Sequence, residues 1–197
     1  MSIRVATDAD RDAIARICRL TGAAGQDATG VYGDDTVLAD VYATPYLDGP
    51  DCFALVWDQG HGAVGYCVGT MDTEAFQAWF SDTWWPSVAS THAIVTEGDE
   101  RLLRAATDRS RMLTPLTGEY PAHVHIDLLP EAQGRGAGRA LIEAAVDLLR
   151  SHGVSGIHLG VDPANEGALA FYPKVGFSVV PDSGGAMFTR ATEASAV

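Results

Sequence analysis

The sequence has almost no lysine, and its basic residues are outnumbered two to one by acidic ones. Lys174 is the single lysine among 13 basic residues. The sequence has 26 acidic residues, so its net charge is −13. Binding to nucleic acid needs a basic face that displaces counterions from phosphates, and this composition can hardly form one. We therefore expect no nucleic-acid partner, and the charge favours an amine-bearing small molecule or peptide.

Long apolar runs and paired cysteines are also missing. No stretch approaches the roughly 18 apolar residues of a membrane span, and the first residues form no apolar segment typical of a signal peptide. Cys18, Cys52 and Cys67 are widely spaced and form no C-x-x-C pair, which argues against a disulfide framework or a zinc ribbon. We expect three reduced thiols in a cytoplasmic protein without membrane association, and a homodimer is left open.

The chain of 197 residues is 47% hydrophobic and long enough to bury one sizeable core. We predict a single domain over residues 1–190 and a flexible tail over 191–197. The apolar pattern predicts an α/β fold, because alternating and helical spacings follow one another along the chain. The predicted elements are strand 3–6, helix 8–20, a helix ending before Pro45, strands 53–57, 63–69 and 123–129, a helix reaching 152, strand 156–161, helix 165–174, and strands 177–180 and 186–189.

A polar and aromatic excursion interrupts this pattern over residues 72–120. We predict one or two helices there, with a break at Trp85-Pro86, because proline cannot donate a helical hydrogen bond. Phe76, Trp79 and Phe80 recur at helical spacing. We interpret these aromatic residues as a core face, and the alternative is that they line a substrate site.

A glycine-rich turn follows strand 123–129 and opens a long helix. Glycines at alternate positions let the backbone approach a phosphate, and the free N–H groups of a helix N-terminus favour an anion. We interpret the turn as a pyrophosphate site, and the alternative is a tight turn without a ligand. The spacing fits neither a P-loop nor a dinucleotide fingerprint. The residues concerned are Gln133, Gly134, Arg135, Gly136, Ala137, Gly138 and Arg139.

Two short signatures stand in order, separated by a helix and a strand. The glycine-rich turn matches the pattern Q/R-x-x-G-x-G/A, and the second signature consists of Asn165, Phe171-Tyr172 and Lys174-Val175-Gly176-Phe177. Together they resemble the GNAT (Gcn5-related N-acetyltransferase) family, and residues 120–130 are similar to the acetyltransferase-like C-terminal domain of eukaryotic O-GlcNAcase and its free-standing bacterial relatives. The resemblance implies a GNAT fold: a mixed, mostly antiparallel central sheet flanked by helices, with a splayed strand pair that binds acetyl-CoA.

The resemblance also implies which residues hold acetyl-CoA as the co-substrate. Backbone groups of Leu128 and Leu129 would pair with the pantetheine arm, and the turn from Gln133 to Arg139 would cradle the pyrophosphate. Asn165 would hydrogen-bond the pantetheine, and Tyr172 would lie beside the thioester. The chain departs from the family pattern at Pro173, which removes a backbone donor near the helix end and can change the orientation of Tyr172.

Acetyl transfer to an amine needs a neutral amine and a proton for the departing thiolate. A phenol of pKa ~10 can protonate a thiolate whose acid has a pKa of ~8.5, so Tyr172 is the candidate general acid. A packed core tyrosine is the alternative. For the general base, strand alternation places His123, His125 and Asp127 on one face. Asp127 is our first candidate and His125 our second, and the alternative is a hydrogen-bonded polar strand face without a catalytic role.

These observations together predict an acetyl-CoA-dependent N-acetyltransferase that acts on a primary amine by direct attack. One alternative keeps the fold without catalysis, as a module that only binds acetyl-CoA. A more remote alternative is a metallohydrolase, because His123, His125 and Asp127 at alternate strand positions could share one zinc. No further ligands stand at recognisable spacing, so we expect no metal.

Overall fold

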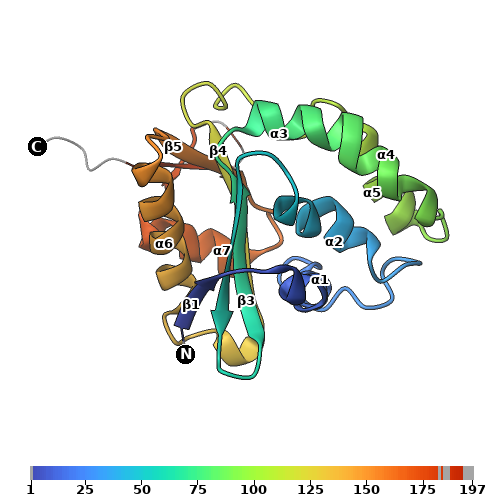
Figure 1. Cartoon of the computed structure of the whole chain (residues 1–197), viewed down its shortest axis with the longest axis horizontal. Helices are drawn as coiled ribbons and strands as arrows, with labels where there is room; N and C mark the ends of the chain where they lie inside the picture. The colour runs from blue at the N-terminus through green and yellow to red at the C-terminus, as the bar shows by residue number, and fades with distance from the viewer. Residues whose placement is uncertain (1, 182, 184–186, 193–197) are drawn as a thin grey trace, which may run out of the picture.

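The computed structural model describes residues 2–181, 183 and 187–192, and it contains one seven-stranded sheet with helices on both faces (Figure 1). The strand order is β1-β2-β3-β4-β5-β7-β6. Only β4 and β5 run parallel, and all other neighbours are antiparallel. The predicted fold class is therefore confirmed. The strands are β1 Ser2–Val5, β2 Cys52–Asp58, β3 Ala63–Thr70, β4 Ala122–Leu128, β5 Gly156–Gly160, β6 Ser178–Val179 and β7 Met187–Ala191.

The parallel pair β4 and β5 is joined over only two residues. Ala122 pairs with Ile157 and His123 pairs with His158, and β4 and β5 form no further pairs with each other. The two strands diverge from that point, so a gap opens along the C-terminal half of β4. This divergence is the splayed strand pair that the family resemblance predicted.

Helices cover the two faces of the sheet unequally (Figure 1). One face carries α6 and α7, and the other carries α1, α2 and the helices of the excursion. Each long helix is amphipathic, and its apolar stripe supplies one of two cores separated by the sheet. The helices are α1 Arg11–Thr21, α2 Val37–Tyr42, α3 Thr73–Trp79, α4 Trp85–Val88, α5 Glu97–Thr107, α6 Ala137–Ser151 and α7 Glu166–Phe171.

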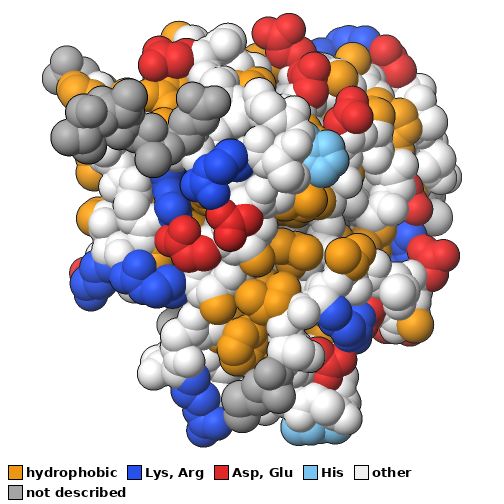
Figure 2. All heavy atoms as spheres, turned by 60° about the vertical axis from the view of Figure 1, so that its left-hand side comes forward, with side chains coloured by type: hydrophobic (Ala, Val, Ile, Leu, Met, Phe, Trp, Pro, Cys, Tyr) orange, Lys and Arg blue, Asp and Glu red, His pale blue; other side chains and the backbone are white. Residues whose placement is uncertain are grey.

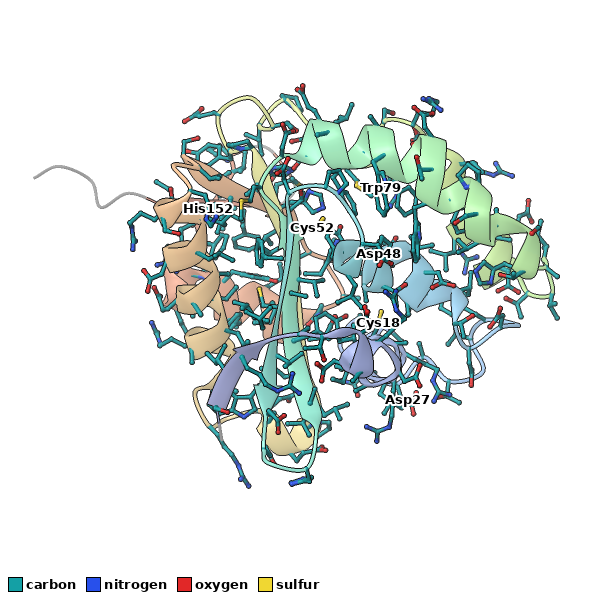
Figure 3. All side chains as sticks on the ribbon, viewed as in Figure 1. Cys18, Asp27, Asp48, Cys52, Trp79 and His152 are labelled. Atoms are coloured by element: carbon teal, nitrogen blue, oxygen red, sulfur yellow. The ribbon has the colours of Figure 1, made fainter. Side chains whose placement is uncertain are left out.

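The excursion differs from the prediction at Trp85-Pro86, where the helix does not break. A π-helical turn over Phe80–Trp84 joins α3 to α4, and the N–H of Trp85 reaches the carbonyl of Phe80, five residues back. Pro86 follows directly as the second residue of α4, where no backbone donor is needed. Phe76 and Phe80 are fully buried and Trp79 lies between α3 and α2 (Figure 3), as expected for a core face.

The end of the fold lies slightly further along the chain than predicted. Ala191 is the last residue of β7, and Thr192 is buried, with its N–H donating to the carbonyl of Ser155 at 3.0 Å. Residues 191 and 192 therefore belong to the domain and not to the predicted tail. The rest of that tail, residues 193–197, lies outside the described residues, as does residue 186 of the last predicted strand.

Candidate active site

The gap between β4 and β5 exposes one edge of the β4 backbone. In the antiparallel register with β3, the N–H of Leu129 donates to the carbonyl of Val64 at 2.9 Å, and alternate residues of β4 share this direction. The N–H and C=O groups of Leu128 and Ile126 therefore point the other way, into the gap. An extended ligand arm can pair with them as an additional strand would.

The expectation for Leu129 is consequently wrong. Its N–H is bonded to Val64, and its carbonyl accepts the N–H of Ala132 at 2.9 Å. The N–H of Leu129 is therefore not free for a pantetheine arm and its carbonyl already has a donor, whereas the N–H and C=O groups of Ile126 point into the gap. Leu128 keeps the predicted direction, although the side chain of Gln133 already donates to its carbonyl at 2.9 Å. The side-chain amide of Gln133 thus binds the end of β4.

The glycine-rich turn has the geometry of an anion cradle at the start of α6. Gly134 and Gly136 have φ values of +68° and +81°, and a Cβ atom on either would meet nothing within 4 Å. Gly138 is different, because a Cβ there would lie 3.1 Å from the Phe171 ring, so glycine allows α6 to pack closely. In the described part of the chain, no acceptor faces the first N–H groups of this 15-residue helix, those of Ala137, Gly138 and Arg139.

The side chains around the turn are only partly free. Arg135 is exposed and forms no salt bridge with the described residues, whereas Arg139 donates to the carbonyl of Lys174 at 2.5 Å. Asn165 caps α7, because its side-chain oxygen accepts the N–H of Ala168 at 3.0 Å. Both atoms of its amide lie beside the loop at Gly25. Arg139 and Asn165 would therefore have to exchange or share these contacts to reach a ligand.

Tyr172 is held by its ring and not by its hydroxyl. The ring is buried against Phe171, Phe177 and Phe188, with centroid distances of 5.4, 5.3 and 5.5 Å. Its hydroxyl forms no hydrogen bond with any residue that the structure describes, and burial raises the pKa of the phenol above its ordinary value of 10.0. The hydroxyl is therefore protonated and available as a donor.

Pro173 does not displace this tyrosine. The chain tightens from α7 into a 3₁₀ turn over Tyr172–Val175, and Pro173 is the second residue of that turn. A proline is tolerated there because its missing N–H has no partner in the turn. The Tyr172 carbonyl accepts the N–H of Phe177 at 3.1 Å, which fixes the backbone beyond the proline.

Asp127 lies on the opposite face of β4, next to α1. Its Oδ2 accepts a short hydrogen bond of 2.5 Å from the hydroxyl of the fully buried Tyr66. Burial raises the pKa of the Asp127 carboxyl above its ordinary 3.8, and the hydrogen bond from Tyr66 opposes that rise. The carboxylate is thereby a stronger base than an exposed one.

His125 ends a chain of buried hydrogen bonds that begins at Thr73. Thr73 donates from Oγ1 to the carbonyl of Pro121 at 2.7 Å, so this oxygen must accept from Nδ1 of His123 at 2.8 Å. Nε2 of His123 lies 2.6 Å from the Tyr46 hydroxyl, and that hydroxyl lies 3.1 Å from Nε2 of His125. The two histidines project from β4 toward Tyr46, which lies in the 3₁₀ turn Thr44–Leu47 after α2, and toward Thr73, the first residue of α3.

The order of donors in this chain assigns both histidine tautomers. Burial lowers the pKa of His123 well below 6.5, so the ring is neutral, and with a proton on Nδ1 its Nε2 accepts the Tyr46 proton. The Tyr46 oxygen then accepts the Nε2 proton of His125. Burial, with a contribution from the charge of Arg111, lowers the pKa of His125 to about 4. His125 is therefore neutral and carries its free lone pair on Nδ1.

We expect Thr73→Val to reverse both tautomers. Valine cannot accept the Nδ1 proton of His123, whereas the Pro121 carbonyl keeps the N–H of residue 73 at 2.9 Å. His123 should then carry its proton on Nε2, and Tyr46 should donate to His125 instead. Nitrogen-15 NMR of the imidazoles measures this, with His158, which contacts the carbonyl of Tyr120 at 2.6 Å, as the unaffected control. A wild-type His123 with its proton on Nε2 would contradict the assignment.

These contacts bear on the metallohydrolase alternative. Both ring nitrogens of His123 face protein hydroxyls, and Nε2 of His125 faces the same hydroxyl of Tyr46. Over residues 2–181, 183 and 187–192, no group of three or more His, Cys, Asp or Glu side chains is arranged to hold a metal ion. These hydrogen bonds occupy both ring nitrogens of His123, Nε2 of His125 and Oδ2 of Asp127, whereas Nδ1 of His125 has no partner among the described residues.

Comparison with known proteins agrees with this geometry. The model of the acetyltransferase (GNAT) family matches residues 23–177. The chain belongs to the GNAT family. Among solved structures, the GNAT protein is similar to SsHAT, with 38% sequence identity, a TM-score of 0.88, and 98% of each chain covered. The family prediction made from the glycine-rich turn and the Tyr172 signature is confirmed.

Two further matches are weaker: one shares the fold at low sequence identity, and the other aligns with only part of the chain. The GNAT family acetyltransferase from Brucella melitensis, solved in complex with acetyl-CoA, is 15% identical, with a TM-score of 0.54 and coverage of 98% of this chain and 88% of that one. The mycothiol acetyltransferase of Beutenbergia cavernae is 35% identical over 113 residues, which are 57% of this chain. The matched segment spans 36% of that relative's length.

Sequence reasoning missed several residues of this GNAT site. Tyr46 and Tyr66 bind His125 and Asp127 from elements that lie 79 and 61 residues away along the chain. Arg111 stacks over Tyr42 from the loop after α5. No local pattern marks these residues, because their roles depend on pairings between distant elements. The alternation of β4 was the one available signal, and it correctly placed His123, His125 and Asp127 together.

Proposed function

We propose that this GNAT protein transfers the acetyl group of acetyl-CoA to a primary amine by direct attack. The observation that carries the proposal is the open backbone edge at Leu128 and Ile126, whose side chains pack in the same apolar cluster as the ring of Tyr172. Free N–H groups at the start of α6 suit a pyrophosphate, and the gap suits an extended arm. The Brucella relative, solved with acetyl-CoA, supports this choice of co-substrate.

Each catalytic task has a candidate residue. Asp127 would accept the proton that the amine loses as it attacks, and Tyr172 would donate a proton to the sulfur as the carbon–sulfur bond breaks. His125 would orient the amine, because its free Nδ1 lone pair accepts an N–H. Burial raises the pKa of Asp127 and lowers that of His125, which removes the usual advantage of histidine as a base.

The cysteines support direct attack over an acetyl-cysteine intermediate. Cys18 and Cys67 are buried, Cys52 is partly buried, and all three are free. Burial raises the pKa of Cys52 and Cys67 to about 12, and that of Cys18 further. A thiol with so high a pKa supplies almost no thiolate at neutral pH. The amine is therefore the nucleophile that this site can activate.

We expect acetyl-CoA to stabilise the fold through the glycine-rich turn. At a concentration a hundredfold above its dissociation constant, the gain in unfolding free energy is about 2.7 kcal/mol, visible as a higher melting temperature. Gly136→Val should abolish the gain, because φ is +81° there and valine would disturb the turn. Gly153→Val, at another positive φ of +73° beyond the far end of α6, is the matched control. A wild-type protein that shows no shift with either acetyl-CoA or CoA would refute the proposal.

A module that binds acetyl-CoA without catalysis stays the alternative. A panel of amines with acetyl-CoA, read as release of free thiol, separates the two, because only the enzyme consumes the thioester.

On the face shown in Figure 2, Lys and Arg side chains form small separate groups beside acidic ones. None of the helices in the described part of the chain has the length and apolar character of a membrane span. Cytoplasmic location, the absence of a nucleic-acid partner and a homodimer stay predictions.

A further inference from the structure

Arg111 is a partly buried arginine whose guanidinium has no hydrogen-bond partner among the described residues. Its Nε and Nη2 atoms are shielded from solvent and form no hydrogen bond, and no carboxylate within the described ranges forms a salt bridge with it. Carboxylates are not scarce, because acidic residues outnumber basic ones by 26 to 13. Buried N–H groups of a charged side chain are rarely left without an acceptor in native proteins. An acceptor from outside the chain would satisfy them.

The guanidinium is held in place by two aromatic rings and a fixed backbone. Its Cζ lies 4.9 Å from the centre of the Phe80 ring and 5.3 Å from the centre of the Tyr42 ring. The backbone N–H of Arg111 donates to the carbonyl of Asp108 at 3.2 Å. The backbone N–H of Met112, the next residue, donates to the side-chain oxygen of the buried Gln77 at 3.0 Å. This arginine is therefore preorganised, unlike a flexible surface arginine.

Stacking alone leaves the hydrogen-bonding capacity of Arg111 unused. Aromatic rings interact with the faces of a guanidinium, whereas its five N–H groups lie in its plane. That planar fork matches the two oxygens of a carboxylate or a phosphate. An oxyanion in the plane of the guanidinium would satisfy these donors, and the two rings would form its walls.

The same Tyr42 ring connects Arg111 to the candidate active site. Its centre lies 5.7 Å from the centre of the His125 ring, in an edge-on arrangement. The charge of Arg111 also contributes to the lowered pKa values of His125 and His123. Both observations place the guanidinium beside the position where His125 and Asp127 would meet the amine.

From this arrangement we infer that Arg111 binds an oxyanion carried by the acetyl acceptor. The acceptor would be a small molecule with a primary amine at one end and a carboxylate or phosphate at the other, lying across the Tyr42 ring. The inference rests on the proposed acetyltransferase function and names the class of its acceptor. It also explains how a chain with a net charge of −13 can retain an anionic substrate.

The test compares amines that differ only in the oxyanion. The series from glycine to 6-aminohexanoate is measured against the corresponding amides, and 2-aminoethyl phosphate against ethanolamine. Thiol release from acetyl-CoA gives kcat/KM, and calorimetry with CoA present gives the dissociation constants. We expect the anionic member of at least one pair to be preferred about tenfold or more, as for a hydrogen-bonded ion pair. The favoured pair distinguishes carboxylate from phosphate.

Substitutions of Arg111 then assign the preference to this side chain. Arg111→Gln should reduce it to within about twofold, and Arg111→Lys, which keeps the charge but not the fork, should retain part of it. Arg109→Gln is the matched control, because it removes the same charge from an exposed residue that pairs with Asp82 at 2.6 Å. Thermal melts check the fold. If Arg111→Gln does not fold, Arg111→Lys and the wild-type comparison still decide.

The outcomes separate this inference from the function on which it rests. Equal kcat/KM and equal binding for anionic and neutral partners in every pair would overturn the anion subsite, whether or not the amines are acetylated. If neutral amines or peptide lysines are acetylated without that preference, the proposed function stands and the subsite falls. If anionic probes bind more tightly but nothing is acetylated, the subsite stands and the proposed function falls.

Discussion

Replacing Tyr172 by phenylalanine is expected to lower the rate of acetyl transfer by about 10²–10⁴-fold, the range for lost general acid catalysis. The phenol is buried and its pKa is raised above 10.0, so it holds its proton at any working pH. The same rise makes it a weaker acid than a free phenol, so the developing negative charge on the sulfur must drive the transfer. The affinity for acetyl-CoA should change little. Single-turnover kinetics with an identified acceptor measures the rate, and calorimetry measures the affinity.

The structure makes this substitution informative, because the hydroxyl has no structural partner within the described residues. The ring keeps its contacts with Phe177 and Phe188 in the variant, and removing an unbonded hydroxyl should leave the melting temperature almost unchanged. Tyr120→Phe makes the same chemical change in the loop before β4, at the end opposite the gap, and serves as the control. A near-normal single-turnover rate in Tyr172→Phe would show that another group protonates the thiolate.

Features set by neighbouring residues were predictable from the sequence. The hairpin between β2 and β3 follows from Gly60 and Gly62, which have φ values of +92° and +123°. The start of α6 follows from the glycine-rich turn. The predicted break at Trp85-Pro86 failed because a π-helical turn absorbs the proline, and such a turn leaves no local signature.

Only those residues of the site that a sequence signature or strand alternation marks were predictable. A family signature indicated Tyr172 and strand alternation indicated Asp127, and both roles stay predictions, but the backbone direction expected for Leu129 was wrong. That error arose because the direction of an N–H group depends on the register with β3, where Leu129 pairs with Val64. Register and the distant partner Tyr66 are properties of the folded sheet, so no reading of β4 alone could supply them.

Replacing Asp127 by asparagine is the second change expected to reduce turnover by about 10²–10⁴-fold. Asparagine keeps the shape, and its amide oxygen can still accept the Tyr66 hydroxyl, so the fold should persist. The amide cannot take a proton from the amine. The rate of the variant should therefore rise with pH as the neutral fraction of the amine grows. Asp82→Asn, which alters an exposed carboxylate paired with Arg109, is the matched control.

The pH profile identifies the base independently of the size of the loss. In the wild type, turnover should fall as the pH drops through the pKa of Asp127, which burial raises above 3.8, because protonation removes the acceptor. That acid limb should vanish in Asp127→Asn. His125 titrates at about pH 4, so it stays neutral across the neutral range. A limb that persists near pH 4 in Asp127→Asn and disappears in His125→Gln would assign the proton transfer to His125 and leave Asp127 as the carboxylate that attracts the amine.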